Sequence, residues 1–255
     1  MIHGVLLDLG GVIFVGDKAL PGAVDAVARL RERRLPLRFI TNTTRTPLPG
    51  MRDKLAAMGL EIAAEEMFMP AVAARIRLQA ERLRPHLLVH PALQGEFQGL
   101  TGTRGTAVVI GDAGRYFDYD SLNAAFRALN GADDFLALAR NRTFQDADGE
   151  LSLDAGPFVA ALEYASGRTA TVLGKPSGDF FRAAVDSLGV APETAVMVGD
   201  DAESDVAGAQ AAGLQGILLR QGKYRAGDEA GIAPPPTAVL DDLPAAVDWI
   251  LARAR

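Results

Sequence analysis

Cysteine is absent from the 255-residue chain, which excludes disulfides and thiolate metal sites. Histidine is scarce: the three residues are His3, His86 and His90. His86 and His90 are four residues apart, but they flank a short apolar run and are interpreted as structural or surface residues. A transition-metal centre is therefore not expected, and any bound metal should be a hard cation held by oxygen atoms.

The chain also lacks a basic excess and a long apolar run. Its net charge is −6 with no basic stripe, which argues against nucleic acid or an anionic membrane as a partner. No uncharged apolar segment reaches the roughly 18 residues of a membrane span, and the short apolar run near the start lacks the features of a signal peptide. We therefore expect a cytoplasmic protein. The 49% of hydrophobic residues suffices for a sizeable core.

Short apolar runs alternate with amphipathic patterns in the first and last thirds of the chain. The runs at 4–8 and 35–42 predict strands, and the segments at 21–33 and 47–60 predict helices. Short links in this order indicate parallel strands joined by right-handed crossovers. The last third repeats the rhythm, with strands expected at 169–175, 194–200 and 215–219 and helices at 177–190, 204–213 and 242–255.

The middle of the chain predicts a second α/β unit inserted into the first. Strands are expected at 86–91, 106–112 and 134–141, helices at 118–131 and 155–167, and a hairpin turn at Asp148-Gly149. We therefore predict an α/β fold with a doubly wound parallel-sheet core at 1–80 and 172–255, and an inserted α/β domain at 81–171.

Polar side chains end several predicted strands of the outer unit. They are Asp8, Thr41-Asn42, Asp200-Asp201 and Lys175, the last interpreted as closing a fourth strand. Ligands bind at the carboxyl ends of the strands in open α/β sheets, so these groups predict one site.

The chemistry of this set suits phosphoryl transfer. An aspartate on a rigid strand end, such as Asp8, can attack phosphorus and form an aspartyl-phosphate. Mg²⁺ between Asp8 and Asp200, together with the Lys175 ammonium, would neutralise the meeting anions. The Thr41 hydroxyl and the amides after it can hold phosphate oxygens.

Four ordered motifs resemble those of the haloacid dehalogenase (HAD) superfamily. They are DLGGV (8–12), FITNTT (39–44), LGKPS (173–177) and MVGDDAESD (197–205). The insert between the second and third motifs resembles a C2-type cap, as in subfamily IIA. The tail from 208 onward resembles the branch that contains HAD-like hydrolase domain-containing protein 2 and the phospholysine phosphohistidine inorganic pyrophosphate phosphatases.

The resemblance implies a role for each matching residue. It implies a Rossmann-like HAD core, a Mg²⁺ cofactor and a phosphohydrolase activity through an aspartyl-phosphate. The roles are nucleophile and metal ligand for Asp8, phosphate binding for Thr41 and Asn42, orientation of nucleophile and phosphate for Lys175, metal binding for Asp200 and the Gly10 carbonyl, and support of the acidic site for Asp201 and Asp205.

Gly10 departs from the family pattern, because most HAD phosphatases have at this position an aspartate that protonates the leaving group. Glycine keeps the backbone carbonyl but loses proton donation, which is worth about 10²- to 10⁴-fold in rate. We therefore expect a preference for substrates that depart without an acid: pyrophosphate, phosphoramidates or acyl phosphates rather than alkyl monoesters.

Several alternatives stay open at this point. Asp201 could serve only as a helix cap, Thr43 and Thr44 compete with Thr41, and Asn141 with Arg142 could reach the site from the cap. A catalytically weak regulatory protein that binds phosphate and Mg²⁺ is the alternative function that Gly10 favours, and a phosphorylated receiver domain is a less fitting one. The expected partner is a small phosphorylated substrate or a phosphoprotein, and a homodimer remains open.

Overall fold

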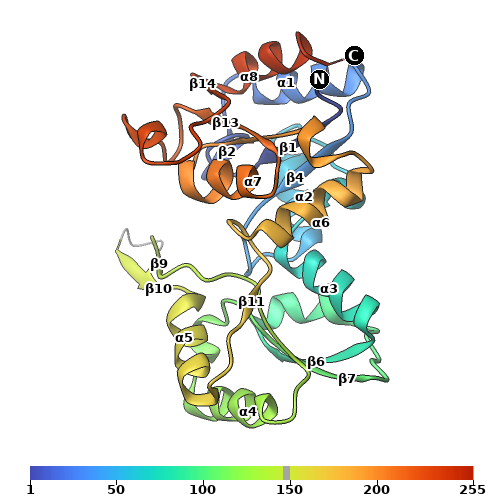
Figure 1. Ribbon diagram of the computed structural model, residues 1–255, viewed down its shortest axis with the longest axis vertical. Coiled ribbons are helices and arrows are strands. Elements are labelled where there is room, and N and C mark those ends of the chain that lie inside the picture. The colour runs from blue at the N-terminus through green and yellow to red at the C-terminus, as the bar shows by residue number, and fades with distance from the viewer. Residues whose placement is uncertain (146–149, 255) are drawn as a thin grey trace. The chain divides into compact units, whose positions relative to one another are not determined.

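The computed structural model describes residues 1–145 and 150–254 and shows a mixed α/β protein (Figure 1). Its internal contacts divide it into two compact units. Unit 1 comprises Met1–Thr41, Pro49–Phe68 and Lys175–Arg255, and unit 2 comprises Asn42–Leu48 and Met69–Gly174.

Unit 1 is built on a six-stranded parallel sheet. Its strands, in spatial order, are β14 (Ala238–Leu240), β13 (Gln215–Leu219), β12 (Ala195–Gly199), β1 (Gly4–Asp8), β4 (Leu37–Ile40) and β5 (Met67–Phe68). Every residue of β1 and β12 is buried, as expected for central strands covered on both faces. The order is that of a doubly wound sheet, so the predicted fold class is confirmed.

Helices cover both faces of this sheet. Figure 1 shows α1 and α8 side by side on one side of it, and α6 and α7 on the other. The α-helices of unit 1 are α1 (Ala23–Glu32), α2 (Leu48–Ala57), α6 (Gly178–Leu188), α7 (Gly208–Ala211) and α8 (Leu243–Leu251). Unit 1 also has short 3-10 helices at η1 (Ala64–Glu66), η4 (Pro192–Thr194) and η6 (Asp228–Ala230), and a π-helix at η5 (Ala202–Ala207). A small hairpin pairs β2 (Phe14–Val15) with β3 (Lys18–Ala19).

Unit 2 has its own four-stranded parallel sheet and one hairpin. The sheet order is β11 (Thr171–Val172), β8 (Asp134–Ala137), β7 (Gly105–Ile110) and β6 (Leu83–Leu88), and the hairpin pairs β9 (Thr143–Gln145) with β10 (Leu151–Leu153). The predicted turn at Asp148-Gly149 lies outside the described residues. The helices are α3 (Pro70–Glu81), α4 (Tyr119–Leu129) and α5 (Ala155–Ser166), with 3-10 helices η2 (Pro91–Phe97) and η3 (Gly114–Tyr116).

The prediction of a core-sheet strand at 169–175 is wrong. Only Thr171–Val172 forms a strand, and it pairs with β8 in the sheet of unit 2. Lys175 therefore lies in a loop at the start of a segment of unit 1 and does not end a strand of the core sheet.

The boundaries of the two units differ from the predicted ones. The predicted core extended to residue 80, whereas α3 belongs to unit 2 because it packs on β6 and η2. Residues 42–48 also belong to unit 2, where the backbone N–H of Leu48 donates to the Glu96 carboxylate at 2.9 Å.

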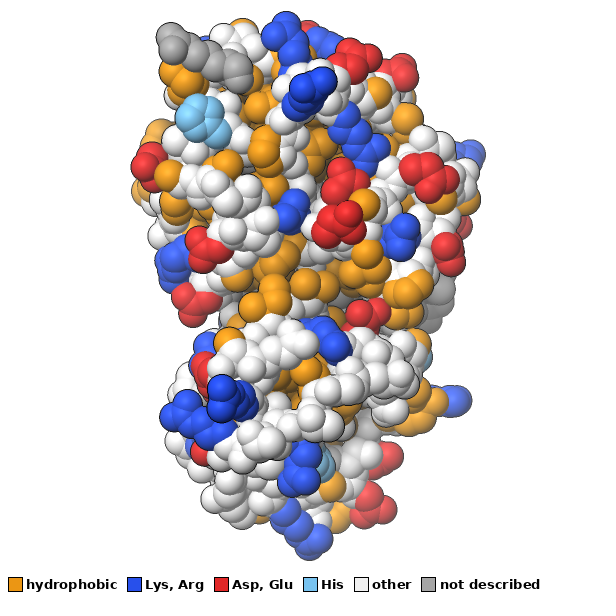
Figure 2. Space-filling view, turned by 90° about the vertical axis from the view of Figure 1, so that its right-hand side faces the viewer, with side chains coloured by type: hydrophobic (Ala, Val, Ile, Leu, Met, Phe, Trp, Pro, Cys, Tyr) orange, Lys and Arg blue, Asp and Glu red, His pale blue; other side chains and the backbone are white. Residues whose placement is uncertain are grey.

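Acidic and basic side chains are interspersed with hydrophobic ones on the face that Figure 2 presents. No helix among the described residues has both the length and the apolar character needed to cross a membrane.

Candidate active site

Asp8 and Asp200 lie at the topological switch point of the unit 1 sheet. Asp8 is the last residue of β1, and Asp200 directly follows β12, the parallel neighbour of β1. The chain returns to opposite faces of the sheet from these two strands, which opens a crevice for ligands at their carboxyl ends. Both carboxylates are nonetheless buried, with 7% of Asp8 and 1% of Asp200 exposed.

Asp205 completes a cluster of three buried carboxylates. One oxygen from each of Asp8, Asp200 and Asp205 lies within 4.8 Å of the other two. Asp205 comes from η5, and Gly199 makes room for it, because a Cβ at residue 199 would lie 2.3 Å from the Asp205 side chain. Three like charges at this spacing repel one another unless a cation joins them.

Lys175 supplies one such cation. Its Nζ donates to Oδ1 of Asp8 at 2.7 Å and to Oδ1 of Asp205 at 2.6 Å. The Lys175 side chain is 5% exposed, so both ion pairs are shielded from solvent. Burial acts to lower the pKa of Lys175, but the Asp205 and Asp8 carboxylates outweigh it and raise this pKa. The lysine is therefore protonated and holds the Asp8 carboxylate in a fixed orientation.

Burial shifts the pKa values of all three carboxyl groups upward. It raises the pKa of Asp200 to about 6, against a backbone hydrogen bond from Lys223 that acts to lower it. It likewise raises the pKa of Asp205 to about 6 and raises that of Asp8, in both cases against the opposing charge of Lys175. One ammonium thus leaves the cluster short of positive charge.

The residues fit a hard divalent cation. Within the described part of the chain, Oδ1 of Asp200 is buried without a hydrogen-bond partner, which is costly unless something else binds it. Two oxygen ligands of Mg²⁺, at about 2.1 Å each, lie up to about 4.2 Å apart. The three carboxylate oxygens lie within 4.8 Å of one another, which is close to this value. Oxygen donors and an unpartnered buried carboxylate oxygen are what such an ion requires.

Two glycines allow the Asp200 carboxylate to sit where it does. A Cβ at Gly11 would lie 1.9 Å from Oδ2 of Asp200, and one at Gly222 would lie 2.0 Å from the same atom. The same Oδ2 accepts a hydrogen bond from the backbone N–H of Lys223 at 2.7 Å. Gly11, Gly222 and Lys223 were not predicted as site residues, although Gly11 belongs to the DLGGV motif.

Gly10 has open space around its α-carbon. A Cβ there would meet no described heavy atom within 4 Å, and the backbone is outside the left-handed region that strains other residues. The absence of a side chain at this position is therefore not imposed by packing.

The phosphate-binding candidates fall on both sides of a unit boundary. Thr41 follows β4, whose last residue Ile40 is paired with Asp8, so Thr41 emerges at the same sheet edge as the carboxylates. Asn42 is the first residue of unit 2, and its role remains a prediction. Thr44 is engaged within unit 2, where its Oγ1 accepts from the backbone N–H of Asp112 at 3.2 Å.

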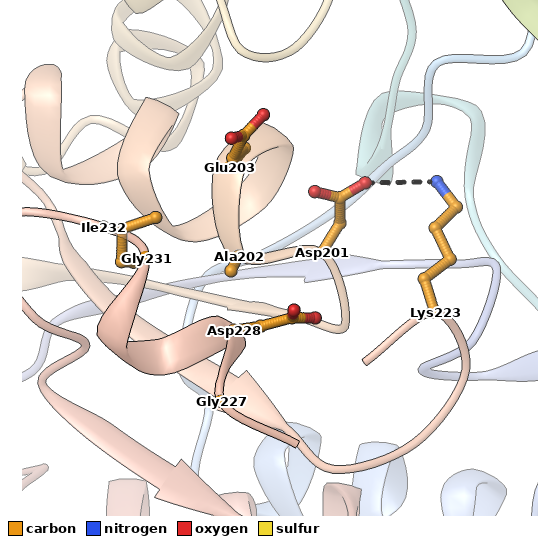
Figure 3. Close-up of a pocket in the computed structure, with 8 residues that line it drawn as sticks. All are labelled: Asp201, Ala202, Glu203, Lys223, Gly227, Asp228, Gly231 and Ile232. Atoms are coloured by element: carbon orange, nitrogen blue, oxygen red, sulfur yellow. Dashed lines mark hydrogen bonds and ion pairs between the residues drawn. The ribbon is translucent and has the colours of Figure 1, made fainter. Parts of the chain in front are cut away.

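Asp201 caps a helix, which was predicted as the alternative to a role in supporting the acidic site. Its Oδ1 accepts from the backbone N–H of Ser204 at 2.9 Å at the start of η5. Its Oδ2 lies 3.4 Å from the Lys223 ammonium. Figure 3 shows this pair at one side of a pocket of about 340 Å³, lined by Asp201, Ala202, Glu203, Lys223, Gly227, Asp228, Gly231 and Ile232.

Comparison with known proteins adds to this geometry. The family model described as haloacid dehalogenase-like hydrolase matches residues 5–102, and one described as HAD-hydrolase-like matches residues 172–246. A zebrafish (Danio rerio) protein named phospholysine phosphohistidine inorganic pyrophosphate phosphatase is 44% identical over 256 residues, which cover 98% of this chain and 94% of that protein. This chain belongs to the haloacid dehalogenase-like hydrolase family.

Two further proteins are similar to this chain. Human haloacid dehalogenase-like hydrolase domain-containing protein 2 is 43% identical over 250 residues, covering 98% of this chain and 96% of that protein. The crystal structure of a glycerol phosphate phosphatase from Mycobacterium tuberculosis in complex with magnesium has a TM-score of 0.81 and 28% identity, covering 96% of this chain and 76% of that one. The HAD-like chain described here is accordingly a phosphatase-type hydrolase, and the predicted family resemblance is confirmed.

Proposed function

We propose that this HAD-like hydrolase is a Mg²⁺-dependent phosphohydrolase that works through an aspartyl-phosphate on Asp8. The observation that carries the proposal is the convergence of Asp8, Asp200 and Asp205 around the Lys175 ammonium at the carboxyl ends of β1 and β12. The magnesium in the Mycobacterium tuberculosis phosphatase and the pyrophosphate in the zebrafish relative's name support it.

Asp8 is the nucleophile in this proposal. A carboxylate oxygen of Asp8 bonds to the phosphorus of the substrate as the bond to the leaving group breaks, and the leaving group takes that electron pair. Water then bonds to the same phosphorus, and the bond between phosphorus and Asp8 breaks. The Asp8 carboxylate is restored, and inorganic phosphate is released.

The other residues orient and balance charge. Lys175 holds the Asp8 carboxylate by its hydrogen bond of 2.7 Å, and its ammonium would balance charge on phosphoryl oxygens bound beside Asp8. Asp8, Asp200 and the Gly10 carbonyl would hold Mg²⁺, with Asp205 holding Lys175 in place. When bound, Mg²⁺ supplies positive charge that lets the anionic nucleophile approach the anionic phosphoryl group. Thr41, with Asn42, would bind phosphoryl oxygens, and unit 2 would act as a C2-type cap.

The absent side chain at Gly10 defines the substrate class that we propose. Without a proton donor at this position, a leaving group must depart as a stable anion or already carry its proton. Pyrophosphate, phosphoramidates and acyl phosphates, whether free or as a phosphoprotein, meet this condition better than alkyl monoesters. The glycerol phosphate phosphatase shows that the fold also occurs with an alkyl ester substrate, so residue 10 and not the fold is the basis of this proposal.

A phosphatase screen with and without Mg²⁺ tests the proposal. The panel should contain pyrophosphate, a phosphoramidate, acetyl phosphate and a sugar phosphate, with Asp8→Asn as the control for contaminating activity. We expect Mg²⁺-dependent turnover that Asp8→Asn abolishes, with kcat/KM highest for the first three substrates. A higher kcat/KM for the sugar phosphate would contradict the leaving-group proposal. Turnover equal in the wild type and Asp8→Asn, with Mg²⁺ still bound, would instead favour a regulatory protein on this scaffold.

A further inference from the structure

A cavity of about 410 Å³ lies in unit 2, beside the edge strand β6. Its walls come from the first halves of β6 and β7 and from the end of α4, all labelled in Figure 1. The lining residues are Arg84, Pro85, His86, Thr106, Val108, Arg127, Ala128 and Gly131.

The sequence of β6 and β7 explains why this part of the sheet is polar. Arg84 is paired with Thr106, and His86 with Val108. Side chains on a strand alternate between faces, so Arg84 and His86 share a face with Leu88, which belongs to the buried apolar cluster under α4 and α5. One face therefore changes from apolar to cationic along its length, and the cationic end opens onto the cavity.

The charged side chains that line the cavity are arginines, and they have no ion-pair partner among the described residues. Within residues 1–145 and 150–254, no ion pair or side-chain hydrogen bond is made by Arg84, His86 or Arg127. None of the lining residues carries a carboxylate.

The acceptor groups beside Thr106 and at the end of α4 have other hydrogen-bond partners. The Asp133 carboxylate accepts from the backbone N–H of Thr106 at 2.9 Å. The carbonyls of Leu129, the last residue of α4, and of Ala132 accept from Nη1 of Arg168 at 2.9 and 2.5 Å. Among the described residues, the Asp133 carboxylate makes no ion pair with Arg84 or Arg127.

We propose that this cavity binds a small, multiply charged anion of the phosphate type. Two guanidinium groups can each make paired hydrogen bonds to phosphate oxygens, and the Thr106 hydroxyl and His86 ring add donors. The volume is in the range of small-molecule sites, at about 300–1,000 Å³. Pro85, Val108 and Ala128 give an apolar wall, so the anion could be free or carry an organic group. This site goes beyond the proposed function, because none of its residues belongs to the carboxylate cluster of unit 1.

Titration of the full ¹⁵N-labelled chain tests the proposal. The probes are inorganic tripolyphosphate and ADP, added in EDTA at low salt so that neither is hydrolysed. We expect saturable shifts of the Thr106 and Gly131 amides in NMR spectra. Tighter binding of ADP would identify an organic phosphate as the natural class, and tighter binding of tripolyphosphate a free one.

A double variant, Arg84→Gln with Arg127→Gln, provides a second test, in which the affinity for tripolyphosphate is measured. Its affinity for tripolyphosphate at the Thr106 and Gly131 amides should fall by about tenfold or more, because each lost guanidinium removes charge-assisted hydrogen bonds. The matched control, Arg33→Gln with Arg225→Gln, makes the same charge change at exposed positions outside the cavity and should lose less than about twofold. Shifts absent from Thr106 and Gly131, or equal losses in the two double variants, would overturn the proposal.

Discussion

Lys175 balances more charge than any other single side chain described in the candidate active site. It is buried and bonded to Asp8 and Asp205, and burial has already raised the pKa values of both acids. Removing the ammonium would leave two buried carboxylates repelling each other and an unfixed nucleophile. A buried ion pair broken on one side commonly costs about 3–5 kcal/mol.

Replacing Lys175 by methionine should therefore affect both activity and stability. We expect kcat for pyrophosphate to fall by about 10²- to 10³-fold, the usual loss for one preorganised donor. We expect the free energy of unfolding at pH 8 to fall by about 3 kcal/mol. Steady-state kinetics and urea unfolding measure the two effects. Lys18→Met, at an exposed lysine of β3, is the matched control and should change neither. A Lys175→Met enzyme within threefold of wild type would contradict the role given to this residue.

At residue 10 the structure permits a gain of function. A side chain there meets open space on an ordinary backbone, so Gly10→Asp should fold without a clash. The new carboxyl group could protonate a leaving alkoxide, which is worth about 10²-fold or more when well placed. We expect kcat/KM for a sugar phosphate to rise by about tenfold or more, and that for acetyl phosphate to change little.

Comparison with Gly10→Asn separates proton donation from simple filling of this space. Asparagine has the same shape and cannot donate a carboxyl proton, so it should leave the sugar phosphate rate low. An equal rise in Gly10→Asp and Gly10→Asn would refute the explanation based on a missing acid.

At the scale of elements, the buried strands were the most predictable parts of the site. GVLLD and AVMVG are continuous apolar runs, and each leads into an aspartate, so β1 and β12 followed from the sequence. The strand before Lys175 was wrongly placed, because Ala170 to Gly174 is apolar enough for either sheet. Its pairing with β8 depends on contacts that a local pattern does not contain.

Close approaches of the backbone were not predictable. Gly11 and Gly222 are more than two hundred residues apart, yet both flank Oδ2 of Asp200. A glycine in a sequence indicates a turn or a close approach, and only the three-dimensional neighbours tell which. For the same reason the backbone hydrogen bond from Lys223 to Asp200 gave no local signal.

Gly11→Ala should disable the site by collision. The new Cβ would overlap Oδ2 of Asp200 at 1.9 Å, so the carboxylate has to move out of position. We expect Mg²⁺ affinity, measured by calorimetry, to fall by about tenfold or more, as happens when the surroundings of a metal ligand are altered. Gly16→Ala is the matched control. Gly16 also has a positive φ, of 59°, but a Cβ there meets nothing described within 4 Å.

The Gly16→Ala variant carries the backbone strain without the collision. It should lose about 1 kcal/mol of stability and keep its Mg²⁺ affinity. Equal losses of affinity in both variants would mean that strain in the segment after β1, and not the fit around Asp200, controls the site.

For the whole molecule, the carboxylate cluster links folding to pH and to metal. The ordinary pKa of an aspartate is 3.8, and the pKa values of Asp200 and Asp205 in the folded protein are raised to about 6. The native state therefore binds more protons than the unfolded state between these values. Under that condition stability falls as pH rises.

The raised pKa of Lys175 does not change this slope. A lysine with a raised pKa contributes stability in full below its ordinary pKa of 10.5, and this value lies above the pH range in which Asp200 and Asp205 titrate. Asp118 and Glu229 have lowered pKa values because backbone hydrogen bonds favour their charged forms. The stability that these two groups contribute is lost only on acidification below about pH 4, which is below the pH range in which Asp200 and Asp205 titrate.

Metal-free protein should thus lose stability between pH 4.5 and pH 7, by on the order of 3 kcal/mol in the free energy of unfolding. Urea unfolding in EDTA across this range measures it. Asp200→Asn removes one titrating carboxyl and keeps its shape, so its profile should be flatter. The difference from wild type cancels the contribution of groups outside the carboxylate cluster. Mg²⁺ should restore the wild type most strongly above pH 6, where the carboxylates are ionised, and should restore Asp200→Asn much less. A wild-type profile no steeper than that of Asp200→Asn would show that the cluster does not hold unbalanced charge, and the argument for a divalent cation would lose its physical basis.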